Sequence, residues 1–483
     1  MNQENTPLFD GLKQFIAKQP ISYHVPGHKN GLLYEHIGEG IFNALLQMDA
    51  TEVEGLDDLH EAEGIIEEAQ QLLSKAYNSA KSYFLVNGST VGNLAMILGV
   101  CREGDTVLVQ RNCHKSIMNA LALVKAKPIF LKPYLNEKWG IAEGVPYNTI
   151  QKAIKQHPDA KAVILTYPTY YGTGEDITEH IALAHEKGIQ VLVDEAHGAH
   201  FIAGAPFPRS SLTMGADYVV HSAHKTLPAM TMGSYLHMGK YSRERERVHH
   251  YLQMLQSSSP SYPIMASLDL ARSYIATYSK KDAQYIAEMS AIFKRNLNQI
   301  ECIAVLENTS GINDCLKMAI MTDGTFTGLA LQEELATLGV YTELADVHKV
   351  LFILPLLKKG QHYPFEQTVQ IVSKAVEQLK EKENKLADEA FGLGDYSAEI
   401  VSLSIGFSDM ESCTKEMVPL AAAAGRIAAE TITPYPPGIP LLLNGETISE
   451  GHVGKIQSLI KAKARFHGFM DPEKKRIRVY GKM

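Results

Sequence analysis

The chain has 483 residues, of which 45% are hydrophobic and 21% are charged. This length supports two or three domains with sizeable cores, and the composition excludes wholesale disorder. The formal net charge of −8 provides no broad cationic surface, so we expect no nucleic-acid partner. The five cysteines are widely spaced without a C-x-x-C pair, and no apolar run is long enough to cross a bilayer. Because the N-terminus also lacks the features of a signal peptide, we expect a cytoplasmic protein with reduced thiols and no membrane partner.

Short apolar runs alternate with helix-like segments from about residue 80 onward. They are rich in β-branched residues and apolar on both faces, which is typical of strands covered by helices on both sides. We therefore predict an α/β fold with a mostly parallel sheet. Its strands are expected at Ser82–Val86, Thr106–Gln110, Pro128–Leu131, Ala162–Thr166, Gln190–Asp194, Tyr218–His221 and Ser234–His237.

The second half of the chain predicts further domains. Two helical stretches over roughly 262–300 lead to strands near 314–321 and 348–355 with helices between them, which indicates a smaller α+β domain. The polar, glycine-containing stretch 381–398 is typical of a linker. We expect four parts: an N-terminal segment at 1–45, a large domain at 46–275, a small α+β domain at 276–382, and a C-terminal α+β domain at 383–483.

Asp194-Glu195-Ala196-His197 spells the DEAH box of nucleic-acid helicases, in which the acidic pair holds Mg²⁺ beside ATP. That chemistry requires an upstream phosphate loop of the form G-x-x-x-x-G-K-[ST], and none precedes residue 191. Asp194 instead ends a predicted strand, and active sites of α/β sheets form at the carboxyl ends of strands. The sequence therefore favours a different use of this carboxylate.

Two further stretches follow predicted strands. Lys225 lies in Ser222-Ala223-His224-Lys225-Thr226, where hydroxyls and a histidine flank a candidate Schiff-base nucleophile. A surface lysine would give the same pattern. The second stretch, 87–93, opens a predicted amphipathic helix with small and hydroxyl residues, which suits a phosphate at the helix N-terminus. Ser89 or Thr90 acting only as an N-cap is the simpler alternative.

Taken together, the three stretches describe a pyridoxal-phosphate (PLP) site. The phosphate would lie on the helix opened by Gly88-Ser89-Thr90, Lys225 would bind the aldehyde covalently, and Asp194 would pair with the pyridine nitrogen. At these motifs the sequence resembles the Orn/Lys/Arg decarboxylase family in its short bacterial form, a group of fold-type I, aspartate-aminotransferase-like PLP enzymes. The resemblance runs through nearly the whole chain, at HVPGHK (24–29), GLDDLH (55–60), NGST (87–90), RNCHKS (111–116), DEAHGAH (194–200), SAHK (222–225), SSSPSY (257–262) and YPPGIP (435–440).

The resemblance implies roles at matching positions. Lys225 and Asp194 would act as described, and His114 would stack on the cofactor ring opposite Ala196. Ser258 would reach a phosphate in the partner subunit of a homodimer or larger homo-oligomer, and Glu343 would contact the distal cation of a basic substrate. The full set of cofactor-binding residues is expected to be Gly88, Ser89, Thr90, His114, Asp194, Ala196, His197, Ser222, His224, Lys225 and Ser258.

Some of these features have simpler interpretations. His197 and His200 are three residues apart, but two histidines without a third ligand indicate a metal only weakly, so we expect none. Glu343 is also compatible with a solvated carboxylate at a strand edge. The stretch 435–440 is typical of a rigid extended turn, and no role is predicted for it.

The same cofactor supports several reactions, and one sequence feature separates them. An aminotransferase typically binds the substrate carboxylate with a small-domain arginine, but no arginine lies between Arg295 and Arg426. A decarboxylase instead favours a poorly solvated carboxylate. With Lys225 or His114 as the proton donor to Cα, we expect decarboxylation of arginine, lysine or ornithine to agmatine, cadaverine or putrescine, which are polyamine precursors. An aminotransferase or a related fold-type I enzyme, and a non-catalytic PLP-binding regulatory homologue, are the alternatives.

Overall fold

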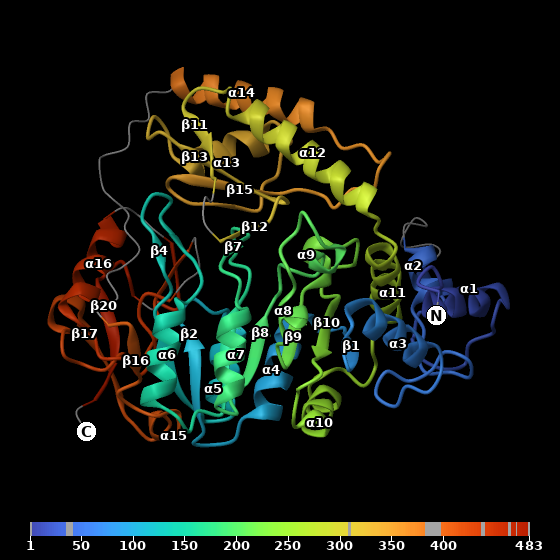
Figure 1. Ribbon diagram of the computed structural model, residues 1–483, viewed down its shortest axis with the longest axis horizontal. Helices are drawn as coiled ribbons and strands as arrows, with labels where there is room; N and C mark the ends of the chain where they lie inside the picture. The colour runs from blue at the N-terminus through green and yellow to red at the C-terminus, as the bar shows by residue number, and fades with distance from the viewer. Residues whose placement is uncertain are drawn as a thin grey trace. The chain divides into compact units, whose positions relative to one another are not determined.

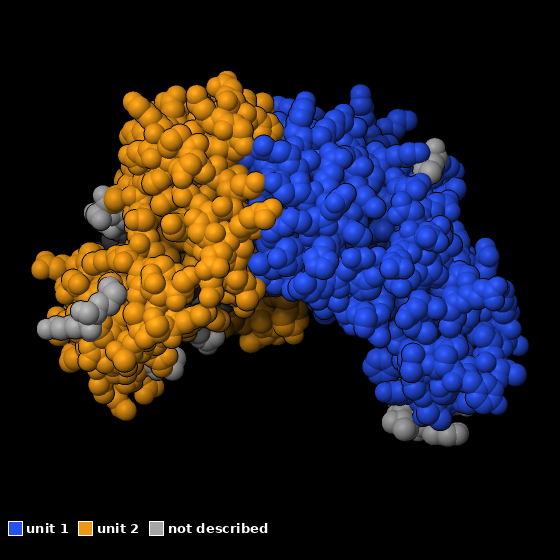
Figure 2. Space-filling view, turned by 90° about the horizontal axis from the view of Figure 1, so that it is seen from below, with its two compact units in different colours: residues 1–100, 190–283 blue, residues 101–189, 284–483 orange. Residues whose placement is uncertain are grey.

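The computed structural model describes residues 2–34, 42–307, 311–381, 398–435, 440–461, 465–469 and 471–481. Its contacts divide the chain into two compact units, and each combines segments that are distant in sequence. Unit 1 comprises residues 1–100 and 190–283, and unit 2 comprises residues 101–189 and 284–483 (Figure 2). The four-part domain division expected from the sequence stays a prediction.

Unit 1 contains four sheet strands in the order β1-β10-β9-β8. Strands β8 and β9 are parallel, whereas β10 pairs antiparallel with both β9 and β1. Every residue of β8, β9 and β10 is buried, which explains why these runs are apolar on both faces. The bounds are β1 Lys81–Leu85, β8 Gln190–Asp194, β9 Tyr218–His221 and β10 Ser234–Met238, within one residue of the predicted ends.

Helices complete unit 1 (Figure 1). Helix α4 packs on β1, β9 and β10 and on α10, so it is buried on almost every side rather than amphipathic as predicted. A Cβ at Gly99 would lie 2.3 Å from Val248 of α10, so glycine is needed for this close helix contact. The helices are α1 Pro7–Ala17, α2 Asn43–Met48, α3 Ile65–Tyr77, α4 Gly88–Val100, α8 Ser211–Met214, α9 Ala223–Thr226, α10 Arg245–Leu255 and α11 Tyr262–Ala276, with 3₁₀ turns η1 Leu32–Tyr34 and η2 Phe201–Ala203.

Unit 2 contains four more sheet strands in the order β6-β2-β3-β16. Strand β2 is parallel to both β6 and β3, and β16 pairs antiparallel with β3. The elements of this part are β2 Thr106–Gln110, α5 Lys115–Leu123, β3 Lys127–Leu131, β4 Leu135–Asn136, β5 Ile141–Ala142, α6 Tyr147–Gln156, β6 Ala162–Thr166, β7 Thr173–Gly174, α7 Thr178–Glu186 and β16 Ile400–Ser402. Alternation of parallel strands with helices confirms the predicted α/β fold.

A second sheet of unit 2 is antiparallel, in the order β11-β13-β15-β14. It confirms the strands predicted near 314–321 and 348–355. Figure 1 shows α12 and α14 lying along this sheet. The elements are α12 Lys280–Leu297, β11 Ile303–Val305, β12 Ile312–Asn313, β13 Lys317–Thr322, α13 Gly328–Thr337, β14 Leu344–Ala345, β15 Lys349–Ile353 and α14 Phe365–Glu381; α12 begins in unit 1.

The C-terminal part of unit 2 has its own apolar cluster around Ile432, Leu442 and Ile456. The elements of this part are the antiparallel strand pairs β17 Lys415–Pro419 with β20 Arg476–Tyr480 and β18 Thr433–Tyr435 with β19 Arg465–His467, the helices α15 Phe407–Met410 and α16 Glu450–Lys461, and the 3₁₀ turn η3 Leu420–Ala422. The predicted linker and the centre of YPPGIP, residues 382–397 and 436–439, lie outside the described residues. Among the helices of the described residues, none is both long and apolar enough to span a membrane.

Candidate active site

Asp194 is the last residue of β8 and is only 3% exposed. Its Oδ2 accepts a 2.9 Å hydrogen bond from the side-chain amide of Asn93 on α4, and its Oδ1 accepts a 3.2 Å bond from the backbone N–H of Ala196. These two hydrogen bonds fix the orientation of the carboxylate. Asp194 therefore provides a buried, oriented carboxylate at the carboxyl end of a strand.

Glu195, the second acidic residue of the DEAH stretch, is fully buried. Its Oε1 lies 3.0 Å from Nε2 of His221, and its Oε2 accepts hydrogen bonds from the backbone N–H and the hydroxyl of Ser211. Both oxygens are thus used within the protein. This arrangement does not suit a carboxylate that must serve a metal-bound nucleotide, so the structure gives no support to the helicase interpretation.

Lys225 lies in the short helix α9, directly after β9. Its Nζ is 3.2 Å from Nε2 of His197, a residue only 6% exposed and three positions after Asp194. The backbone N–H and the ring Nδ1 of the neighbouring His224 both bond to the carbonyl of Gly233, which fixes the turn. The structure therefore brings the predicted lysine to the segment that follows the predicted carboxylate.

The N-terminus of α4 lies beside the same turn. The helix begins at Gly88, whose φ of +77° favours glycine, and continues with half-buried Ser89 and exposed Thr90. The hydroxyl of Ser222 donates a 2.7 Å hydrogen bond to Oγ of Ser89. Because the first N–H groups of a helix have no partner within the helix, this end provides anion-binding donors lined by two serine hydroxyls.

Two predicted site residues, His114 and Glu343, belong to unit 2. His114 is exposed and caps the N-terminus of α5, with its Nδ1 2.8 Å from the hydroxyl of Ser116. Glu343 is also exposed, directly before β14, and accepts a hydrogen bond from the hydroxyl of Tyr170. Their predicted roles toward the ring and the substrate stay proposals.

Ser258 is exposed in unit 1. The backbone N–H of the preceding Ser257 donates to Oδ1 of Asn87 at 3.4 Å, and the Ser257 carbonyl lies 2.9 Å from Nε2 of His60. The SSSPSY stretch thus lies next to the residue that precedes Gly88 in the same chain. Whether Ser258 serves this site or that of a partner subunit is untested, so the partner role stays a prediction.

The GLDDLH stretch, which had no assigned role, supports this region structurally. The carboxylate of Asp57 accepts hydrogen bonds from the backbone N–H groups of Gly64 and Ile66, both at 2.9 Å, and so caps α3. The carbonyl of Asp57 accepts from the hydroxyl of Tyr262, the last residue of SSSPSY. GLDDLH therefore contacts both ends of the serine stretch, through Asp57 and His60.

The two histidines of DEAHGAH have different surroundings. His197 contacts Lys225, whereas His200 is fully buried and packs edge-on against Phe201 and Phe207 at 4.8 and 4.9 Å. Within the described ranges, no group of three or more His, Cys, Asp or Glu side chains is placed to hold a metal ion.

Sequence reasoning missed four polar residues of this region. Asn93 was within the quoted helix stretch, and His221 and His237 ended predicted strands, but none of the three had a role, while Ser211 was not considered. All four are fully buried. A histidine inside an apolar strand was the available signal, because buried polar groups require partners.

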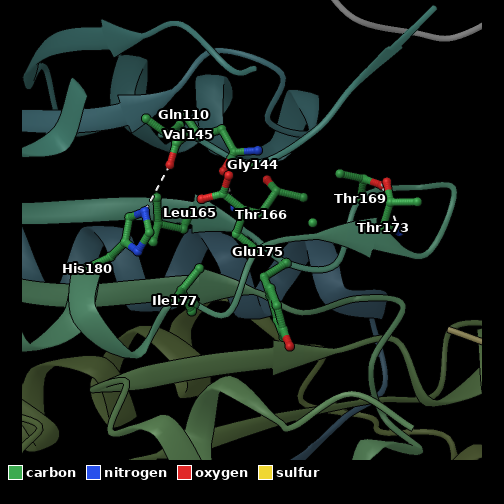
Figure 3. A pocket seen from close by; sticks show the side chains of 12 residues that line it. Gln110, Gly144, Val145, Leu165, Thr166, Thr169, Thr173, Glu175, Ile177 and His180 are labelled. Carbon is green, nitrogen blue, oxygen red and sulfur yellow. Dashed lines mark hydrogen bonds between the residues drawn. The ribbon is translucent and has the colours of Figure 1, made fainter. Parts of the chain in front are cut away.

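A small cavity lies in unit 2, at the carboxyl ends of β2 and β6 (Figure 3). Gln110, Thr166 and His180 contribute to its lining, and Figure 3 shows the 2.9 Å bond between Nε2 of His180 and the carbonyl of Val145. Its volume of about 10 Å³ is close to that of one water molecule by the same measure. This cavity is therefore too small for a cofactor or an amino acid.

The fold and the site define an α/β protein with a lysine, a buried carboxylate and a hydroxyl-lined helix N-terminus at the carboxyl ends of sheet strands. Residues 6–322 match the Orn/Lys/Arg decarboxylase major domain, and residues 401–473 match the C-terminal domain of that family. The chain belongs to the Orn/Lys/Arg decarboxylase family, which confirms the resemblance.

Individual proteins agree with this assignment. The uncharacterized protein YaaO of Bacillus subtilis is 46% identical over 99% of this chain and 98% of its own length. The arginine decarboxylase of the same organism is 33% identical over 99% of this chain and 98% of its own length. The solved constitutive lysine decarboxylase of Escherichia coli has a TM-score of 0.79 at 18% identity, covering 99% of this chain and 82% of that one, and shows the shared fold.

Proposed function

We propose that the protein is a PLP-dependent decarboxylase that converts a basic L-amino acid (arginine, lysine or ornithine) to the corresponding amine (agmatine, cadaverine or putrescine) and CO₂. The observation that carries the proposal is the arrangement of Lys225, Asp194 and the N-terminus of α4 in one compact unit. Membership of the decarboxylase family and the likeness to an arginine decarboxylase support the substrate class.

The residues present suit PLP. A primary amine at Lys225 suits the aldehyde, the buried carboxylate of Asp194 suits a protonated pyridine nitrogen, and the Ser89–Ser222 hydroxyl pair at a helix N-terminus suits the phosphate. Thr90 and His224 flank this pair, Ala196 follows the carboxylate, and His197 contacts the lysine amine. When bound, the cofactor supplies an electron sink, which Asp194 strengthens by stabilising the ring-nitrogen proton.

Two residues of the protein are candidate donors of the proton that the substrate Cα must accept. The Lys225 amine, 3.2 Å from His197, would carry a proton toward the substrate Cα. His114 is the second candidate donor and the candidate for stacking on the ring. No arginine lies between Arg295 and Arg426, so the small domain lacks the carboxylate clamp typical of an aminotransferase.

Glu343 is proposed to bind the distal cation of the substrate. The hydroxyl of Tyr170 donates a hydrogen bond to its carboxylate, which restricts an otherwise exposed side chain to one orientation. A positioned carboxylate of this kind matches the ammonium or guanidinium group that all three candidate substrates share.

We also propose a cytoplasmic homodimer or larger homo-oligomer in which Ser258 reaches the partner's phosphate. The five cysteines are widely spaced in the sequence and form no C-x-x-C pair, which suits a reducing compartment. Several large apolar side chains that are near one another in sequence are exposed in the N-terminal part of unit 1, and exposed apolar side chains favour burial against another subunit. They are Ile21, Tyr23, Val25, Leu32, Leu33, Tyr34 and Phe42.

The test is a screen of L-amino acids with purified protein and added PLP. We expect CO₂ and the amine to form in equal amounts from one basic amino acid, and a yellow protein that borohydride bleaches. Stoichiometric amino-group transfer to a 2-oxo acid would instead establish the aminotransferase alternative. A colourless protein that binds no PLP would contradict the proposal as a whole.

A further inference from the structure

A buried carboxylate–imidazole contact links the two strand ends that carry the candidate active-site residues. Glu195 directly follows Asp194 at the end of β8, and His221 is the last residue of β9, directly before the Ser222–Lys225 turn. Both side chains are fully buried, with Oε1 of Glu195 3.0 Å from Nε2 of His221. Glu195 is therefore adjacent in sequence to Asp194, and His221 is adjacent to Ser222.

Backbone and side-chain bonds reinforce the link. The N–H of Glu195 donates to the carbonyl of Val220 at 3.0 Å, and the N–H of Ser222 donates to the carbonyl of Ala196 at 3.3 Å. The second carboxylate oxygen of Glu195 accepts both donors of Ser211, the first residue of α8. Glu195 therefore joins three segments: the end of β8, the end of β9 and the start of α8.

His221 is held from its other side as well. Its Nδ1 lies 3.0 Å from Nε2 of His237 on β10, and Nδ1 of His237 lies 2.7 Å from the hydroxyl of Ser82 on β1. The ring of Tyr77 stacks on His237 with centroids 4.3 Å apart. The network thus crosses all four sheet strands of unit 1, and each ring in it has a fixed orientation.

We propose that Glu195 is a positioning residue of the active site, which sets the separation between Asp194 and the Ser222–Lys225 turn through His221 and Ser211. This inference rests on the proposed function, because its consequence is expressed at the bound cofactor. Glu195 itself points into the network and serves neither the ring nor the substrate. Displacements of an ångström in such a site are sufficient to lower turnover strongly.

Three substitutions separate positioning from charge and from general stability. Glu195→Ala removes every bond of the carboxylate. Glu195→Gln keeps them: its oxygen accepts from Ser211, and its amide donates to Nε2 of His221 once the ring carries its proton on Nδ1. Asp217→Ala is the matched control, because Asp217 is 1% exposed and its Oδ2 accepts from the N–H of Val191 at 2.7 Å, at the opposite end of the same two strands.

The holoenzymes of wild type and all three variants are compared by absorbance spectrum, kcat and KM. We expect Glu195→Ala to keep a borohydride-reducible link but to show a shifted cofactor band, with kcat lower by about 10- to 100-fold and KM nearly unchanged. Glu195→Gln should rescue both the band and most of kcat. Asp217→Ala should lower the melting temperature and leave the band in place. Equal losses in the Gln and Ala variants, or in Asp217→Ala and Glu195→Ala, would overturn the positioning role.

Amide hydrogen exchange on the cofactor-free proteins tests the same inference independently of the proposed function. Glu195→Ala should exchange faster at 194–197 and 221–226 together, while 106–110 exchanges as in the wild type. Unchanged exchange in both segments would count against the link. If Glu195→Ala does not fold, Ser211→Ala is measured by the same spectra, kinetics and exchange, because it removes the hydroxyl donor to Glu195 but keeps the backbone N–H and the carboxylate. A wild type that binds no PLP would refute the proposed function but leave this exchange result decisive.

Discussion

The side-chain amide of Asn93 donates a 2.9 Å hydrogen bond to Oδ2 of Asp194, and both side chains are buried. Asn93 lies on α4, the same helix whose N-terminus provides the candidate phosphate site. One helix therefore orients the carboxylate with its first turns and presents anion-binding donors at its end. This arrangement links the two predicted contacts with the cofactor, Asp194 and Gly88–Thr90, although they are 104–106 residues apart in the chain.

Asn93→Ala is expected to lower kcat about tenfold, because a hydrogen bond to a charged group contributes about 1.5–3 kcal/mol. Steady-state kinetics per bound cofactor measures this loss. The control is Gln70→Ala, which removes a buried amide whose oxygen accepts from the N–H of Phe84 at 3.0 Å, in the same unit. Gln70→Ala should reduce stability without changing turnover per cofactor, and an equal fall in both variants would contradict a specific role for Asn93.

Asp194→Asn keeps the shape of the side chain but removes its charge. We expect kcat to fall about 100-fold or more, because the ring-nitrogen proton loses several kcal/mol of stabilisation in a poorly hydrated site. The cofactor absorbance at several pH values, recorded beside kcat, shows whether the ring has lost its proton. Turnover near that of the wild type would rule out the assigned pairing.

Lys225→Ala should bind the cofactor without a borohydride-reducible link and lose nearly all turnover, because the substitution removes the amine proposed to bind the aldehyde. Reduction followed by peptide mapping of the wild type should label Lys225 alone. Lys240→Ala, an exposed lysine after β10 in the same unit, serves as the control and should behave as wild type. Labelling of a different lysine would show the assignment to be wrong.

Glu343→Gln is expected to raise KM for the basic amino acid tenfold or more, because an unmatched desolvated cation costs roughly 2–5 kcal/mol. The cofactor band should not change. Tyr170→Phe, which removes the hydroxyl that orients Glu343, should raise KM by a smaller factor. Glu333→Gln makes the same charge change at an exposed position on α13, so an equal KM in the two glutamine variants would exclude direct substrate contact.

Stability should fall as the pH decreases below about 6.5, the ordinary histidine value. Burial, with a smaller contribution from His221, lowers the pKa of His237 well below that value, so the folded protein keeps this ring neutral while the unfolded chain takes up a proton. The stability present at neutral pH is therefore lost progressively as pH falls from 6.5 toward the folded pKa. His237→Gln should flatten the dependence of melting temperature on pH between 7 and 5.5, and an unchanged slope would assign the effect to other groups.

The sequence by itself determined the α/β fold and most strand ends to within one residue, and it supplied the candidate residues of the site. Strands buried on both faces must be apolar throughout, so the local composition predicts their length and position. Lys225, Asp194 and Ser89 were candidates for the same reason, because each lies at or just after the end of such a strand, and the carboxyl ends of strands in α/β sheets form active sites. The local sequence pattern was sufficient to predict a candidate residue wherever that residue and the strand that positions it belong to the same segment.

Only the tertiary structure decided what Glu195, Asn93 and His221 do. Glu195 was one letter of an ambiguous DEAH stretch, and its burial against His221 and Ser211 depends on the pairing of β8 with β9 and the position of α8. Helix α4 was expected to be amphipathic, yet packing against α10 on its outer side buries it almost completely. Contacts between segments far apart in sequence leave no periodic signal in either segment, since each polar group is satisfied by a partner that only the folded chain brings near.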